Sequence, residues 1–380
     1  MKLYICIVLY YVLSMVIEKI LHNRLNRKIW VLIIVLPLLI LSAFRAPTVG
    51  NDTFNYYRSY MMVSQEAFFS PSQSRLELGY IFYMRLIALF GFSYLGFQII
   101  TSTFIMFSVS RFIYKYSSNM AFSFFIFITA RMFFNSMNIS RQFLSIAILL
   151  FSIDFIKERK FIKFTIFVLL ATSIHFTSIV FFVVYPLSYI KFNAKKTILL
   201  LSLGVISAIS FDKLIQIFVS VTGRYAGYLE GGYFNFEGNI AIYINLIINL
   251  LFFLVAVFTK YWRCDELEKL DEKLGLNNQF IKQGFSNENL WYIFCLLTLI
   301  LSIIGLNATI LSRIESYYSI FFLAFIPNVV KYIRSKELRA IVTLGIIVGL
   351  FASFIVVMVF RPYWTTVYPY VWYWDWRLSN

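Results

Sequence analysis

Long apolar segments recur along the entire chain, with charged residues mainly near their ends. A segment of about 20 mostly apolar residues can cross the hydrocarbon core of a bilayer as an α-helix. Strands of a transmembrane barrel would instead show short alternating apolar patterns. Only 14% of the residues are charged, whereas about a quarter are charged in a typical soluble domain. The sequence therefore predicts an all-α, polytopic transmembrane helical bundle.

The apolar runs predict about 12 transmembrane spans within a single integral membrane domain over residues 1–380. The run from Leu3 to Ile17 has no basic leader and no small-residue cleavage site, so we expect it to be retained as a span. The predicted spans lie at about 3–20, 29–44, 94–113, 120–135, 139–156, 161–173, 176–190, 197–210, 240–260, 289–305, 315–331 and 340–360.

The apolar stretch from Leu78 to Phe90 decides the topology, because Arg85 interrupts it. If this stretch crossed the membrane, the basic loops would alternate between the two sides. If it is a re-entrant or interfacial helix near 78–90 at the outer surface, all basic loops face the cytoplasm, as the positive-inside rule requires. We therefore expect both termini outside, outer loops at about 45–93 and 211–239, and a cytoplasmic loop with a solvated helix at about 261–288.

In this topology, lysines and arginines are distributed differently between the two sides of the membrane. Of the 17 lysines, only Lys2 and Lys213 lie on the outer side. Topology depends on positive charge alone, and the positive-inside rule disfavours positive charge on the outer side. Arginines on that side therefore indicate a role for the planar guanidinium, such as binding phosphate or carboxylate. Interfacial anchoring is the alternative for Arg361 and Arg377. Ten of the 17 arginines lie on or near the outer side: Arg45, Arg58, Arg75, Arg85, Arg131, Arg141, Arg224, Arg313, Arg361 and Arg377.

The net charge of +16 fits cytoplasmic loops that face anionic lipid, and no nucleic-acid-binding motif accompanies it, so we expect no nucleic-acid partner. Cys6, Cys264 and Cys295 are scattered without the spacing of a metal site. The chain contains only two histidines, His22 and His175. We therefore expect no metal site and no cofactor.

Polar residues gather in four segments on the predicted outer side. In the first segment, Pro47 and Gly50 predict a turn, and Asp52 stands where it can cap the following helix, which is enough to explain its presence. His175 stands alone between two short apolar runs, where a structural histidine is the alternative to a catalytic one. The four segments are Phe44–Tyr56, Asn138–Gln142, Ala171–Ser178 and Leu311–Tyr318.

Three short patterns follow one another along the chain: Arg45 followed by Gly-Asn-Asp-Thr-x-x-Tyr at 50–56, an Arg-Gln pair at 141–142 that opens an apolar run, and Ala-x-x-x-His-x-x-Ser at 171–178. Their order and spacing resemble the EpsG-like branch of the Wzy O-antigen polymerases, over about residues 1–335. The later piece from Arg313 to Tyr317 is similar to the family pattern as well, and so is Gly223-Arg224-Tyr225.

The resemblance implies an enzyme, a glycosyltransferase-type polysaccharide polymerase at the outer face of the bacterial cytoplasmic (inner) membrane. It would transfer a glycan from its polyprenyl diphosphate, such as undecaprenyl diphosphate, onto the sugar end of another lipid-linked repeat unit. The diphosphate is a good leaving group whose charge must be held, and bidentate arginines can do this without a metal. The implied partners are these lipid-linked glycans, the lipid bilayer, and a chain-length regulator and flippase of the same pathway.

The resemblance and the chemistry of the residues together predict the site. The acceptor hydroxyl needs a base or an orienting hydrogen bond. His175 and Asp52 are the main candidates for this role, and Glu77 and Glu315 are weaker ones. Binding of the diphosphate and the sugars is predicted for Arg141, Arg313, Arg45, Arg224, Gln142, Tyr56, Tyr225 and Tyr317.

Other classes of function stay open. A flippase or transporter of the same lipid-linked unit fits the number of spans, but it predicts related halves and a polar central pathway, and the chain shows no convincing internal repeat. A glycan ligase, another outward-facing glycosyltransferase or an acyltransferase would meet the same lipid phosphate with similar arginines. A purely structural membrane protein would not need the excess of arginine over lysine outside.

Overall fold

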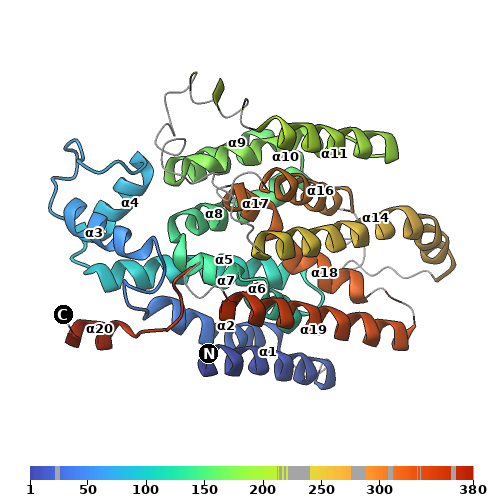
Figure 1. The fold of residues 1–380 in the computed structure, drawn as a ribbon, viewed down its shortest axis with the longest axis horizontal. Coiled ribbons are helices and arrows are strands. Elements are labelled where there is room, and N and C mark those ends of the chain that lie inside the picture. The colour runs from blue at the N-terminus through green and yellow to red at the C-terminus, as the bar shows by residue number, and fades with distance from the viewer. Residues whose placement is uncertain are drawn as a thin grey trace. The chain divides into compact units, whose positions relative to one another are not determined.

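The computed structural model is built from helices and confirms the predicted all-α class. It describes residues 1–21, 26–211, 240–274, 288–306, 311–331, 335–360 and 365–379, with residues 213, 216, 217, 220 and 333 between these ranges. The elements, shown in Figure 1, are α1 (Lys2–Ile20), α2 (Arg27–Ala43), α3 (Thr53–Val63), α4 (Leu78–Leu89), α5 (Tyr94–Tyr116), α6 (Met120–Thr129), α7 (Met132–Asn138), α8 (Ser140–Lys157), α9 (Phe161–Ile174), the 3-10 helix η1 (Phe176–Val183), α10 (Val184–Leu187), α11 (Ala194–Ile209), α14 (Ile240–Leu274), α16 (Glu288–Ile304), α17 (Leu311–Ser319), α18 (Phe322–Lys331), α19 (Lys336–Phe360) and α20 (Tyr373–Ser379).

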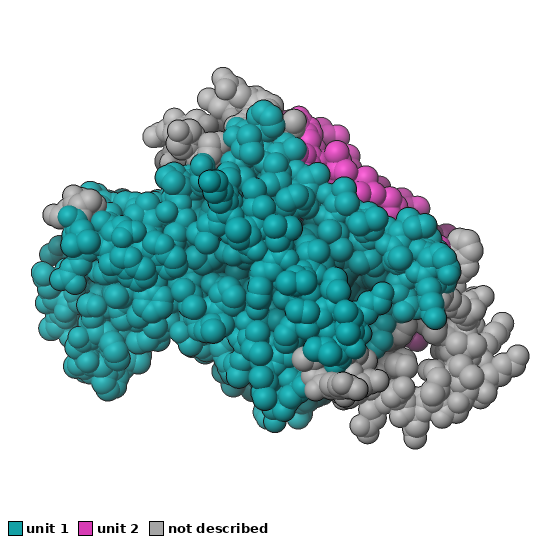
Figure 2. All heavy atoms as spheres, turned by 90° about the horizontal axis from the view of Figure 1, so that it is seen from below, with its two compact units in different colours: residues 1–179, 326–380 teal, residues 180–325 magenta. Residues whose placement is uncertain are grey.

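Contacts divide the chain into two compact units, which Figure 2 shows in different colours. Unit 1 consists of residues 1–179 and 326–380, and unit 2 consists of residues 180–325. Unit 1 therefore contains α1 to α9, α19 and α20, whereas α10, α11, α14, α16 and α17 belong to unit 2. The expectation of a single integral membrane domain stays a prediction.

Four of the described helices are long and apolar enough to cross a bilayer: α1, α5, residues Ala241–Phe258 of α14, and α19. The pair α6 and α7 makes a fifth if it crosses as one bent span. Other predicted runs form shorter apolar helices, so the total of about 12 spans stays a prediction. The 12 residues of α4 extend only about 18 Å, which is shorter than the hydrocarbon core, and the re-entrant or interfacial placement of this helix stays a prediction.

Three of the runs that the sequence predicts as spans contain breaks in the helix, which the sequence does not indicate. The run at 120–135 bends by 60° between α6 and α7, where Arg131 adopts a left-handed conformation with φ of 64°. The run at 176–190 forms the 3-10 helix η1 and the single turn of α10. The run at 315–331 divides into α17 and α18. Such short breaks do not change the apolar composition from which a span is predicted.

The core of unit 1 is built around α6. All of its residues from Met120 to Thr129 are buried, as expected for a helix that is apolar on every face. Helices α1, α2, α5, α7 and α19 pack against it (Figure 1). The buried carboxylate of Glu18 accepts hydrogen bonds from the first N–H groups of α6, at Met120 (3.0 Å) and Ala121 (2.8 Å). Outside this core, α8 packs against α5 and α9, and α4 packs against α9.

Unit 2 is organised around α16, which packs against α10, α11, α14 and α17. Its interior is a stack of aromatic rings. The rings of Phe294 and Phe321 lie 3.7 Å apart between centroids, and Phe181 stacks against each of them at 6.0 Å. Stacked aromatic side chains bury large apolar areas, so this cluster stabilises the packing inside the unit.

The C-terminal segment is folded onto the loop that follows α2, an arrangement that the sequence does not predict. The N–H of Ala46 donates to the carbonyl of Val371 (2.9 Å), and the N–H of Gly50 donates to the carbonyl of Thr366 (3.0 Å). These bonds hold the loop around Gly50 from one side, so the loop has a fixed conformation before α3 begins.

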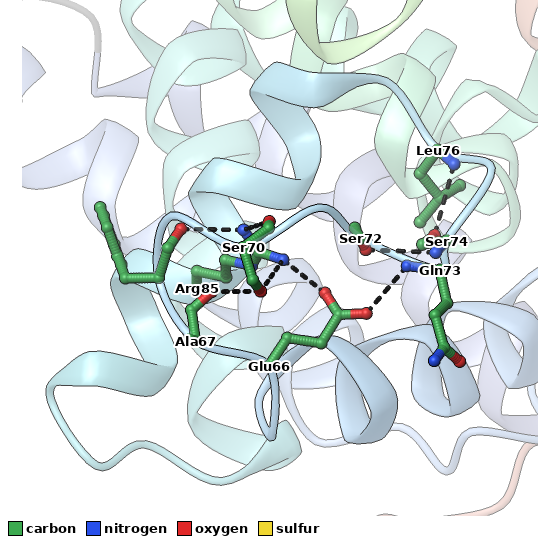
Figure 3. A network of polar contacts seen from close by, with 9 residues as sticks. Glu66, Ala67, Ser70, Ser72, Gln73, Ser74, Leu76 and Arg85 are labelled. Atoms are coloured by element: carbon green, nitrogen blue, oxygen red, sulfur yellow. Dashed lines mark hydrogen bonds and ion pairs between the residues drawn. The ribbon is translucent and has the colours of Figure 1, made fainter.

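Arg85 organises the loop between α3 and α4 (Figure 3). Its side chain is buried, and Nη2 forms an ion pair with Glu66 Oε2 at 2.6 Å. Its Nη1 donates to the carbonyls of Phe68 and Ser70 at 2.8 Å each. Glu66 in turn accepts a hydrogen bond from the N–H of Gln73 (3.0 Å) through its other oxygen. The arginine that interrupts the apolar pattern of α4 therefore fixes the loop that leads into this helix.

We expect Arg85→Met to lower the free energy of unfolding by about 1–3 kcal/mol, because carbonyl oxygens inside the loop lose their donor. Methionine keeps the apolar contacts of the arginine stem, so the change is confined to the guanidinium. Thermal unfolding of the detergent-purified protein measures the effect. Arg75→Met, at an exposed position of the same loop, is the matched control and should leave the midpoint unchanged. Equal shifts in the two variants would contradict this role of Arg85.

Candidate functional site

Glu77 lies at the centre of a polar cluster in unit 1. It ends the loop held by Arg85 and occupies the N-cap position of α4, with extended backbone at φ −65° and ψ 143°. Its side chain makes no capping hydrogen bond to its own helix. The carboxylate is directed at the start of α8 and the start of η1, so it connects three segments that are far apart in the sequence.

Arg141 is in the first turn of α8. Its Nη1 forms an ion pair with Oε2 of Glu77. Its guanidinium carbon lies 5.9 Å from the ring centre of Tyr80, which is buried in the first turn of α4. Among the described residues, neither Nε of Arg141 nor the hydroxyl of Tyr80 has a hydrogen-bond partner, although both atoms are buried. Polar groups buried in this way are uncommon in folded proteins, so the surroundings of Arg141 are incompletely satisfied.

His175 stands at the break between α9 and η1. Helix α9 ends at Ile174, and the backbone of His175 is extended, with φ −149° and ψ 113°. The N–H of Phe176 is thereby placed at a helix start, where such groups lack an acceptor within the helix. Oε1 of Glu77 accepts this hydrogen bond (3.0 Å) and lies 3.4 Å from Nδ1 of His175. The break therefore presents a backbone donor and an imidazole to one carboxylate oxygen.

The approach of α4 to the end of α9 depends on Gly79. A Cβ at this position would lie 2.4 Å from Oγ of Ser173 and 2.7 Å from its carbonyl oxygen, distances that real Cβ atoms do not show. Glu77 precedes Gly79 by two residues, and His175 follows Ser173 by two residues. The contact at Gly79 therefore sets the separation between the carboxylate and the imidazole.

The cluster is accessible and charged. The exposed fraction of the side chain is 20% for Arg141, 24% for Glu77 and 18% for His175, so each side chain keeps part of its surface exposed. Burial opposes ionisation of Glu77, but the nearby imidazole of His175, the charge of Arg141 and the N–H of Phe176 together lower the pKa of Glu77 to about 2. The carboxylate is therefore negatively charged throughout the neutral pH range.

The turn that begins at Arg45 is joined to the end of α7, three residues before Arg141. Arg45 is buried and donates through Nη2 to the carbonyl of Met137 (3.1 Å). The N–H of Asp52 donates to Oδ1 of Asn138 (3.1 Å). The structure thus brings the first and second predicted segments together in unit 1. Arg45 holds backbone carbonyls there, and its binding of diphosphate stays a prediction.

Asp52 occupies the N-cap position of α3, as predicted, but its side chain makes no capping hydrogen bond. Capping therefore does not account for this residue. Its negative charge acts on Arg141, together with the charge of Glu77. Gly50, two residues earlier, has φ of 108° and lies so close to Asn138 that a Cβ would stand 3.0 Å from its Cα.

Tyr56 and Gln142 lie inside the protein near the same cluster. The ring of Tyr56 contacts that of Tyr80, with 6.1 Å between centroids, and both rings are buried. Gln142 is buried in the first turn of α8. The third predicted segment contributes His175, so three of the four segments predicted from the sequence meet around Arg141.

The fourth predicted segment lies on α17 in unit 2. Arg313 is exposed on this helix, and Tyr317 is buried. Glu315 is also buried, and its hydrogen bonds tie α17 to α14 and α16, which fits a structural role better than that of a base. The donors to its carboxylate are Asn245 Nδ2 (2.9 Å), Asn249 Nδ2 (2.8 Å) and Ser302 Oγ (3.0 Å).

Arg224 and Tyr225 lie outside the described residues, as does most of the predicted outer loop at 211–239. Within the described part of the chain, no group of three or more His, Cys, Asp or Glu side chains is arranged to hold a metal ion. The expectations of a metal-independent reaction and of no cofactor stay predictions.

The site predicted from the sequence does not include Tyr80 or Asn138, and it treats Glu77 only as a weaker candidate for the base. Tyr80 is one of many aromatic residues in apolar runs, so no local pattern distinguishes it. Asn138 belongs to a predicted segment, but its contact with Asp52 depends on the break after α6. The position of Glu77 could have been recognised from the sequence. A carboxylate directly before an apolar helix needs a cationic partner when it is partly buried.

The fold and the cluster define an all-α integral membrane protein in which an arginine, a carboxylate and a histidine meet where helices begin and end. The sequence matches the EpsG family over residues 28–372, nearly the whole chain. The chain therefore belongs to the EpsG family, which confirms the resemblance seen in the sequence and indicates a membrane protein of polysaccharide biosynthesis. No curated protein and no solved structure matches the chain.

Proposed function

We propose that this protein polymerises polyprenyl-diphosphate-linked oligosaccharide repeat units at the outer face of the bacterial cytoplasmic membrane. The observation that supports this most directly is the meeting of Arg141, Glu77 and His175, because an anion-binding guanidinium lies next to an imidazole in an accessible cluster. Membership of the EpsG family, and hence a place in polysaccharide biosynthesis, gives independent support.

In the proposed reaction, a sugar hydroxyl of one lipid-linked repeat unit attacks the anomeric carbon of the glycan carried by another. A glycosidic C–O bond forms while the bond between the anomeric carbon and the phosphate oxygen breaks. The electron pair of the broken bond leaves with the lipid diphosphate. His175 takes the proton of the attacking hydroxyl, and Arg141 binds the diphosphate and stabilises the charge that develops on it.

The other predicted residues have supporting roles in this proposal. Asp52 is the second candidate for the base, and its negative charge interacts with that of Arg141. Further contacts to the diphosphate and the sugars are proposed for Arg313, Arg45, Arg224, Gln142, Tyr56, Tyr225 and Tyr317. A chain-length regulator and a flippase of the same pathway are the proposed protein partners.

Reconstitution tests the proposal. The purified protein is placed in liposomes with the lipid-linked repeat unit extracted from a host that lacks this chain, and the products are separated on a gel. We expect a ladder of longer glycans and one released polyprenyl diphosphate for each new glycosidic bond. Movement of the repeat unit across the bilayer without bond formation would instead indicate a flippase, and transfer only to an unrelated acceptor would indicate a ligase.

A further inference from the structure

Glu77 occupies one of the donors of Arg141 that a bound diphosphate could use. One carboxylate oxygen is paired with Nη1 of Arg141, the atom that a phosphate oxygen would also use. The other oxygen accepts the N–H of Phe176 and faces Nδ1 of His175 at 3.4 Å. One carboxylate therefore connects the proposed diphosphate-binding residue with the proposed base, and it is accessible enough to be displaced from either of them.

We propose that Glu77 is an exchangeable internal anion that links diphosphate binding to activation of His175. This inference rests on the function proposed above. In the free protein, Glu77 neutralises Arg141. When the lipid diphosphate binds, its oxygens replace the carboxylate of Glu77 at the guanidinium of Arg141. Glu77 then keeps only its contacts with His175 and the N–H of Phe176.

Charge favours this exchange over any release by protonation. A lipid diphosphate brings at least two negative charges and several oxygens that match the arginine fork, whereas the carboxylate brings one charge. The low pKa of Glu77 keeps this side chain ionised at neutral pH, so a change of pH in that range does not free Arg141. A competing anion of higher charge does.

The same exchange prepares His175 for its proposed role. A carboxylate at Nδ1 keeps the proton on that nitrogen, leaves Nε2 as the basic atom, and stabilises the imidazolium that forms when a hydroxyl proton is taken up. Once Arg141 is occupied by the diphosphate, the charge of Glu77 acts mainly on His175. The acceptor hydroxyl is therefore activated after the donor has bound. Glu77 acts through its neighbours, as a positioning residue.

The test compares affinity and turnover in wild type, Glu77→Asp and Glu77→Gln. Glutamine keeps an oxygen that can accept the N–H of Phe176, but it carries no charge. Farnesyl diphosphate is the binding probe for the purified protein in detergent, and farnesol is the uncharged control. We expect Glu77→Gln to bind farnesyl diphosphate about 10-fold more tightly than wild type, within the usual range of coupling between sites. The polymerisation rate in liposomes should fall by about 10-fold or more. Glu77→Asp should have an affinity and a polymerisation rate between those of wild type and Glu77→Gln.

A merely structural role of Glu77 predicts that affinity and rate fall together, and this result would overturn the proposal, as would an unchanged affinity in both variants. If Glu77→Gln does not fold, Glu77→Asp provides the test: the proposal predicts a higher affinity for farnesyl diphosphate together with a lower polymerisation rate. Glu158→Gln is the matched control, because it removes an exposed carboxylate paired with Lys160 at the turn between α8 and α9. A wild-type protein that neither binds farnesyl diphosphate nor makes glycan would instead contradict the proposed function itself.

Discussion

Arg141→Lys should abolish long glycan chains in the native host and leave the single repeat unit in place. Lysine keeps the positive charge, but it has no planar fork with which to bind two diphosphate oxygens at once. Loss of one donor aimed at a developing negative charge lowers a rate by about 100- to 1,000-fold. Arg141→Ala should be at least as severe, because it also leaves the partly buried carboxylate of Glu77 without its ion-pair partner.

The surface glycan separated on a gel measures this effect, with the amount of protein in the membrane determined in parallel. Arg75→Lys is the matched control, since Arg75 is exposed in the loop between α3 and α4 and should keep the full ladder. Loss of the single repeat unit as well would point to export instead of polymerisation. An unchanged ladder at normal protein levels would remove Arg141 from the proposed site.

The helical class could be predicted because each helix carries its own pattern. The apolar run predicted at 94–113 is α5, and the one predicted at 340–360 lies within α19. The breaks could not be predicted, because they arise from tertiary packing. At the 60° bend between α6 and α7, the left-handed residue is Arg131, where glycine is the usual signal for such a conformation. Without that signal, the flanking apolar residues predict one continuous helix.

The same limit applies to the candidate site. Arg141 and His175 could be selected from the sequence, because arginine on the predicted outer side and a lone histidine are conspicuous in an apolar chain. Their connection could not be predicted, since it depends on the contact of Gly79 with Ser173 and on the loop that Arg85 holds. A carboxylate that serves two partners from different segments leaves no periodic pattern, so the importance of Glu77 emerges only from the fold.

A second large effect is expected at His175, and the choice of substitution separates catalysis from structure. Asparagine places an amide nitrogen near the position of Nδ1, so it can donate a hydrogen bond to Glu77, but it has no basic atom. If His175 accepts the proton of the attacking hydroxyl, His175→Asn and His175→Ala should both lower the polymerisation rate by about 100- to 10,000-fold. The affinity for farnesyl diphosphate should change little in the asparagine variant, because Arg141 is untouched.

If His175 only holds the end of α9 against Glu77, the polymerisation rate should fall in His175→Ala but stay near the wild-type rate in His175→Asn. The initial rate of polymerisation in liposomes, with thermal unfolding of both variants, distinguishes these outcomes. An asparagine variant with more than about one tenth of the wild-type rate is incompatible with general-base catalysis, which contributes at least about 100-fold. Asp52 would then be the remaining candidate for the base, since its charge already acts on Arg141 and its side chain does not cap α3.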